Sequence, residues 1–255
     1  MPFPLAHPAA VLPLRRYCPR WFSFPALVIG SLSPDLGYWS GPLHLGVFSH
    51  RFLAGSFGFC LPIGLLLIRL FYLVRRPAVQ QLPARQRQIF EPLCQRPAGS
   101  LLIIVVSLLV GAWTHILLDS ITHEDGWIVE RPSILDTNVA VGGHQIRVCD
   151  LLYAACTFAG VACVALSYLN WLESVAKVPG WNLPGFKWVS TLVFTGLTLA
   201  VSCASHGESP ALGLVSTGVL TAMLVAVFLT AAGWALSNAG PRSGKFECGR
   251  ESGVV

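Results

Sequence analysis

The densest group of side chains able to bind a metal lies in THILLDSITH, residues 114–123. His115, Asp119 and His123 recur at every fourth position, and each step of four advances only about 40° around a helix. We therefore expect the three side chains on one narrow helix face. Imidazole nitrogens and carboxylate oxygens are ligands of zinc wherever thiolates are absent. The segment is interpreted as a metal-ligand motif, and a polar helix end with hydrated histidines is the alternative.

Two earlier residues are candidate ligands for the same ion. His50 stands in SHRF, before an apolar segment, and would lie at the membrane depth of His115 if the two helices run antiparallel. Asp35 stands in GSLSPDLGY, where an acid within an apolar stretch is expensive and needs a partner. The proline before Asp35 suits a ligand held on a turn, although a helix-capping role is the alternative.

Composition indicates a membrane protein. Of the 255 residues, 54% are hydrophobic and 11% are charged, whereas an ordinary soluble domain has about 25% charged residues. The mean hydropathy is +0.63. We therefore predict an all-α fold, a polytopic transmembrane helical bundle forming a single membrane domain over residues 1–255.

Five segments are long enough to cross a bilayer, which requires about 20 apolar residues each. They are residues 54–74, 100–121, 150–171, 188–205 and 211–237. Residues 1–53 are apolar but broken by proline and glycine, and are predicted to help form the site. Within them, 24–39 is interpreted as a half-helix or re-entrant piece. Residues 54–121 would contain the first two spans with the metal-ligand motif. Residues 150–237 would form three apolar packing spans, and residues 238–255 would form a flexible tail.

Loop charges predict the orientation. Loop 75–99 has five arginines against one glutamate and is expected in the cytoplasm, since cytoplasmic loops are rich in Lys and Arg. Loop 122–149 has four acids against two arginines and is expected outside. The C-terminus would then be cytoplasmic and the N-terminus outside. Arginines within residues 1–53 favour the opposite side for the N-terminus, which would follow if 24–39 crosses the membrane.

Nucleic acid is not expected as a partner. Only Phe90 interleaves the arginines of loop 75–99, whereas single-stranded nucleic acid is bound on several aromatic side chains. Glu124 and Asp125, in the predicted outer loop, could act as a general base or bind a second metal, or could be ordinary loop acids.

Four segments, in their order and spacing, resemble a bacterial membrane-protein family catalogued as domain of unknown function 4184. They are MPFPLAHPAAVLPL, GSLSPDLGY, SHRFLAGSF and THILLDSITHEDGW. A more distant likeness is to inner-membrane metal-dependent hydrolases and to the zinc-dependent phospholipase C and P1 nuclease group. In that group His, Asp, His, a helical His-x-x-x-Asp and a further His bind clustered zinc ions. The likeness implies metal ligands at His7, Asp35, His50, His115, Asp119 and His123.

Two departures from that group reduce the number of expected ions. The group uses an N-terminal Trp amine, whereas this sequence begins Met-Pro, and its later His-x-x-x-Glu is replaced by His144 and Val148. One or two zinc ions are therefore expected, with another divalent metal as an alternative. Asp119 could bridge two ions, and Asp35 could ligate one or orient a water, so both are the candidate catalytic residues.

The resulting hypothesis is a metal-dependent hydrolase of phosphoesters in the inner (plasma) membrane. Its surroundings are membrane lipids, and a site at the outer lipid boundary favours a lipid or lipid-linked substrate. A metal-ion transporter or sensor using the same ligands is one alternative. A non-catalytic membrane protein with a structural metal is another, because a closed four-ligand zinc shell is typical of structural sites.

The orientation can be tested by cysteine labelling from outside, after the native cysteines are removed. A cysteine at position 136 should react with a membrane-impermeant reagent, and one at position 85 should not, because the positive-inside rule places their loops on opposite sides. Labelling at 85 but not at 136 would reverse the predicted topology.

Overall fold

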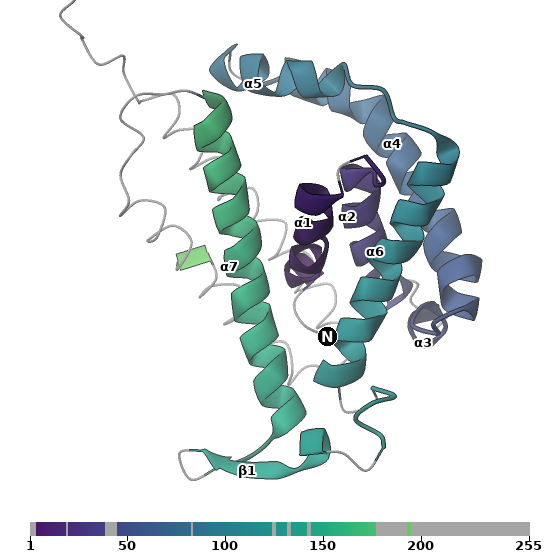
Figure 1. Ribbon diagram of the computed structural model, residues 1–255, viewed down its shortest axis with the longest axis vertical. Coiled ribbons are helices and arrows are strands. Elements are labelled where there is room, and N and C mark those ends of the chain that lie inside the picture. Colours follow the sequence, from purple (N-terminus) through teal and green to yellow (C-terminus); the bar gives the residue numbers. More distant parts are fainter. Residues whose placement is uncertain are drawn as a thin grey trace, which may run out of the picture.

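Three long helices dominate the chain, described by a computed structural model (Figure 1). They are α4 (Leu61–Gln80), α6 (Leu101–Thr122) and α7 (Val148–Ala176). The structure describes residues 4–176, except 19, 39–44, 83, 124–125, 132–133 and 142–143, together with residues 193–194.

These helices correspond to the first three predicted spans. Among the described residues, three helical segments are long and apolar enough to cross a membrane: Ser56–Gln80, Leu101–Thr122 and Val148–Leu172. The first begins with a π-helix, η3 (Ser56–Cys60), that leads into α4. Predicted span 211–237, and 188–205 except for residues 193–194, lie outside the described residues, so a count of five spans stays a prediction.

The N-terminal region forms short helices between α6 and α7 (Figure 1). They are η1 (Pro4–Ala6), α1 (Pro8–Tyr17), α2 (Phe24–Leu32) and, beyond them, α3 (Leu45–Ser49). Nine residues at 1.5 Å each make α2 about 14 Å long, whereas the hydrocarbon core is about 30 Å thick. Residues 24–39 thus contain a half-helix followed by a short 3-10 turn at 35–38.

Glycines bring α2 against α6 at backbone distance. A Cβ at Gly30 would strike the carbonyl of Leu108 in α6, and a Cβ at Gly111 would strike backbone atoms of α2. Small residues at such a crossing allow two helices to approach closely and pack by van der Waals contact. The crossing also brings the end of α2, with Ser31, beside His115 of α6.

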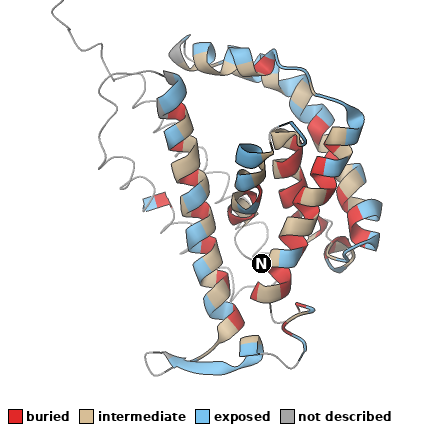
Figure 2. Ribbon diagram, in the orientation of Figure 1, coloured by how far each residue is buried: buried red, intermediate tan, exposed pale blue. Residues whose placement is uncertain are grey.

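Burial is concentrated on the faces of α2 and α6 that meet (Figure 2). One apolar cluster joins α2, α4 and α6 through Ala26, Ile68, Ile104 and Leu108. A second joins η1 and α7 through Ala6, Val161, Ala165 and Phe194. By contrast, α4 exposes a row of large apolar side chains: Leu66, Leu70, Phe71, Leu73 and Val74. Such a surface is unfavourable in water and suits a lipid environment.

The connections lie at opposite ends of the long helices (Figure 1). At one end, α5 (Ala84–Cys94) follows α4. At the other end, between α6 and α7, η4 (Ile134–Asp136) precedes a hairpin of antiparallel strands β1 (Asn138–Val141) and β2 (His144–Arg147). The all-α prediction therefore missed a small hairpin, because strand pairs form on two short segments that carry no strong apolar signal.

Because α2 and α6 cross at backbone distance, replacing a glycine at the crossing by alanine should lower the stability of the protein. Gly111→Ala should destabilise the protein by about 1–3 kcal/mol, because the new Cβ meets rigid backbone. In the matched change Gly64→Ala, the Cβ meets mainly the mobile end of the Leu108 side chain, so the loss should be smaller. Thermal unfolding in detergent measures both. Equal losses would contradict this account of the crossing.

Candidate metal centre

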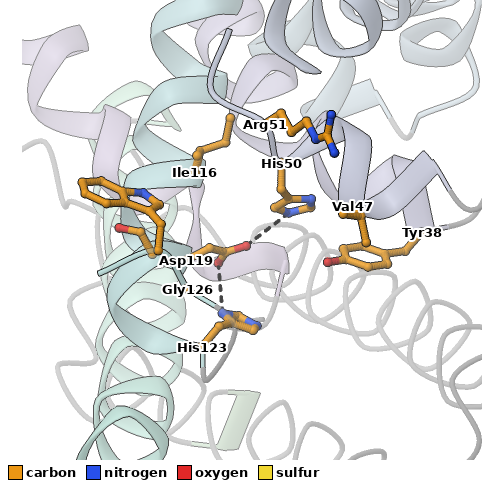
Figure 3. Close-up of a pocket in the computed structure, with 10 residues that line it drawn as sticks. Tyr38, Val47, His50, Arg51, Ile116, Asp119, His123 and Gly126 are labelled. Carbon is orange, nitrogen blue, oxygen red and sulfur yellow. Dashed lines mark ion pairs between the residues drawn. The ribbon is translucent and has the colours of Figure 1, made fainter. Parts of the chain in front are cut away.

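Asp119 is the centre of a cluster of imidazole rings (Figure 3). Its Oδ2 lies 3.1 Å from Nε2 of His115 and 3.2 Å from Nε2 of His50. Oδ1 of Asp35 lies 3.5 Å from the same Nε2 of His115. The ligand atoms of these four residues all lie within 4.8 Å of one another, so the group could hold a metal ion.

Three elements contribute these four side chains. His115 and Asp119 are one turn apart on α6, His50 directly follows α3, and Asp35 follows the end of α2. The hydroxyl of buried Ser49 lies 2.8 Å from the carbonyl oxygen of Pro34 and therefore ties α3 to the turn that carries Asp35. The sequence thus assembles the cluster from segments up to 84 positions apart.

Backbone carbonyls orient two of the imidazole rings. Nδ1 of His115 lies 2.8 Å from the carbonyl oxygen of Ser31, and Nδ1 of His50 lies 2.8 Å from that of Gly46. Because a carbonyl only accepts hydrogen bonds, each Nδ1 must donate its proton. In a neutral ring the lone pair is then on Nε2, which faces Asp119. Metal-binding histidines commonly have this arrangement.

A cation is needed between these groups. A neutral Nε2 and a carboxylate oxygen are both acceptors, so their approach to 3.1–3.2 Å is favourable only with a proton or a metal ion between them. Burial raises the pKa of the Asp35 carboxyl above its usual value. Within the described parts of the chain, neither Asp35 nor Asp119 pairs with an arginine or lysine. The compensating positive charge would come either from a protonated imidazole or from a divalent cation.

Two further predicted ligands lie at the other oxygen of Asp119. Oδ1 is 3.7 Å from Nε2 of His7 and 3.8 Å from Nδ1 of His123. The ring of His7 also stacks on that of His115, with centroids 3.6 Å apart. The structure therefore gathers the other five predicted ligands around Asp119, with His7 and His123 at Oδ1 rather than Oδ2.

His123 lies beside Asp119 as the four-residue spacing predicts, but directly after the last helical residue. Helix α6 ends at Thr122, and His123 is its C-cap residue with extended backbone, φ −117° and ψ 146°. The His123 amide still donates to the Asp119 carbonyl, 3.1 Å away, as in a helix. This bond keeps the ring one turn beyond Asp119 and within 3.8 Å of its carboxylate.

A cavity of about 190 Å³ opens beside the cluster. His50, Asp119 and His123 line it, and Tyr38 and Arg51 line it on the side of His50 (Figure 3). Sequence reasoning missed Tyr38 and Arg51, for which the only signal is closeness in sequence to Asp35 and His50. The other candidates, Glu124 and Asp125, lie outside the described residues.

The comparisons with known proteins give one family. The sequence matches the family described as Domain of unknown function (DUF4184) over residues 1–236. No curated protein and no solved structure matches the chain.

The geometry predicts that the cluster binds metal as a unit. His115→Ala and Asp119→Ala should each remove most bound metal, measured by elemental analysis of purified protein. The double variant should lose little more, because residues that act as a unit are not additive.

The matched control is Leu117→Ala, in the same helix turn. Leu117 is 58% exposed, whereas Ile116 is buried and lines the cavity. Leu117→Ala should keep its metal. Full metal occupancy in folded His115→Ala and Asp119→Ala would refute a metal centre here.

Proposed function

The chain belongs to the DUF4184 family, and we propose that it is a membrane-bound, metal-dependent hydrolase of phosphoesters. One observation carries the proposal. A buried carboxylate, Asp119, faces Nε2 of both His50 and His115 at the wall of an open cavity. Ligands buried on one side and accessible on the other are what a catalytic metal requires, since it must keep a position open for water or substrate.

The proposed ligands form two groups on the two oxygens of Asp119. Asp35, His50 and His115 would hold one zinc ion on the Oδ2 side. His7 and His123 would hold a second ion on the Oδ1 side, with Asp119 between the two. The donor set of imidazole and carboxylate suits zinc and other transition metals better than magnesium or calcium, which prefer oxygen ligands.

The residues of the chain would divide the catalytic work. A bound zinc ion lowers the pKa of a coordinated water to about 7 and so makes hydroxide available at neutral pH. Asp35 is proposed to hold the ion or to orient the water, and Asp119 to fix the spacing of the ligands. The carbonyls of Ser31 and Gly46 keep the His115 and His50 rings in place through their Nδ1 atoms.

The position of the cluster supports a lipid or lipid-linked substrate. His115 and Asp119 lie in the last two turns of α6, an apolar helix long enough to cross a membrane. The cavity would therefore open near the boundary between lipid and water. The loop charges favour the outer side of the inner membrane, with the C-terminus in the cytoplasm.

A structural metal is the second candidate, and one observation favours it. The tight group contains four ligands, and the side chains of His115, Asp35 and Asp119 are at most 10% exposed. A closed four-ligand shell is typical of structural zinc. Activity measurements separate this candidate from the hydrolase.

The hydrolase proposal is tested with purified protein and two substrates, p-nitrophenyl phosphate and bis(p-nitrophenyl) phosphate. Chelation should abolish hydrolysis of at least one, and zinc should restore it. Asp119→Asn and Asp35→Asn should lower kcat/KM by at least about 100-fold, because each removes a negative ligand. Leu117→Ala should retain activity.

Two outcomes would reject the hydrolase. Hydrolysis that survives both chelation and Asp119→Asn would arise elsewhere. Metal that is bound tightly, removed only by unfolding and accompanied by no hydrolysis of either substrate would favour the structural role.

A further inference from the structure

One arginine at the cavity has no partner among the described residues. Arg51 directly follows His50 and lines the cavity, where it is the only arginine or lysine of the ten lining residues. Its side chain is exposed and has no hydrogen bond or ion pair to any residue that the structure describes. Figure 3 shows it on the same side of the cavity as His50.

Several other arginines of the described chain have partners. Arg75 donates to the carbonyl of Arg96, and Arg147 pairs with Asp150. Arg131 lies over the ring of Trp127. Among the described residues, Arg51 combines an unpaired guanidinium with a position at the cavity beside buried metal-binding groups. A guanidinium presents a planar fork of donors that matches the oxygens of a phosphate group.

Exposed apolar side chains line the cavity or lie close to Arg51 in the sequence. Val47 and Trp127, which also line the cavity, are 69% and 51% exposed, and Leu53 is 62% exposed. A cation at the mouth of the cavity with apolar side chains around it is complementary to an amphiphile, which has an anionic headgroup and a hydrocarbon chain. In a chain with three apolar helices, a membrane phospholipid has both properties.

We propose that Arg51 binds the phosphate of a membrane phospholipid whose headgroup enters the cavity, and so determines the substrate class. This inference rests on the proposed function only where it calls the lipid a substrate. Binding of the lipid phosphate by Arg51 does not depend on hydrolysis. Arg51 would contact the phosphate oxygens while the acyl chains lie along Val47 and Leu53. The permanent charge of Arg51 would select a phosphorylated headgroup over an uncharged one.

The test measures equilibrium binding of a non-hydrolysable phosphonate analogue of dihexanoylphosphatidic acid to the zinc-loaded protein. Arg51→Ala should weaken binding by about tenfold, the loss of one charge-assisted contact. The affinity of Arg51→Lys should lie between those of the wild-type protein and Arg51→Ala, because lysine keeps the charge but lacks the planar pair of donors. Arg20→Ala is the control, since Arg20 is exposed and lies beyond the end of α1 remote from His7. Metal content should be equal in all four proteins.

A second arm distinguishes lipid from free phosphate. Leu53→Ser should weaken binding of the analogue without changing that of inorganic phosphate. Leu102→Ser is the control, as Leu102 is 73% exposed at the opposite end of α6. Equal affinity for both probes, unaffected by Leu53→Ser, would overturn the lipid assignment.

The outcomes separate this inference from the proposed function. Binding that depends on Arg51 without any hydrolysis would retain the inference and reject the hydrolase. Hydrolysis with an unchanged dissociation constant in Arg51→Ala would overturn the inference and retain the hydrolase.

Discussion

Two carboxylates buried among histidines create the main electrostatic constraint of this structure. Asp119 and Asp35 cannot be left uncompensated in an apolar bundle, and no arginine or lysine pairs with them in the part of the chain that the structure describes. A proton or a metal ion must therefore balance them. The architecture follows from this need, because the close α2–α6 crossing brings both the Ser31 carbonyl and the Asp35 turn to His115.

The cluster and the basic loop occupy opposite ends of the bundle. Helix α6 is apolar from Leu101 onward and becomes polar only in its last turns, where His115 and Asp119 lie. Arg75 and Arg96 meet at the other end, where Arg75 donates to the Arg96 carbonyl. The helices between them expose apolar side chains, most extensively on α4. This arrangement places the His and Asp cluster near one end of the apolar helices, and Arg75 and Arg96 near the other end.

Periodicity and hydropathy in the sequence predicted the apolar helices and most of the ligand positions. The four-residue spacing correctly placed His115 and Asp119 on one face of α6. His50 lies beside them as expected, although it follows the short helix α3 rather than opening a span. The predicted second span, 100–121, ends one residue before α6 does at Thr122, but the extended backbone of His123 was not predicted, because a cap depends on local conformation rather than on apolar periodicity. The hairpin after Asp136 had only one signal, Gly142–Gly143 between short alternating segments. Arg51 and Tyr38 reach the cavity through tertiary packing, which no spacing rule describes.

The exposed fraction of the side chains in the cluster increases toward the cavity, and this gradient bears on whether a bound ion would be structural or catalytic. The side chains of His7 and His115 are 0% exposed, that of Asp119 is 10% exposed, and those of His50 and His123 are 16% and 21% exposed. A purely structural ion would gain nothing from ligands that border a cavity, since hydration there weakens electrostatic interactions. A hydrolytic ion needs one rigid, dry side that fixes the ligands and one open side that admits water and substrate. The increase in exposure around Asp119 matches this need, and it supports our proposal of catalysis over a structural role.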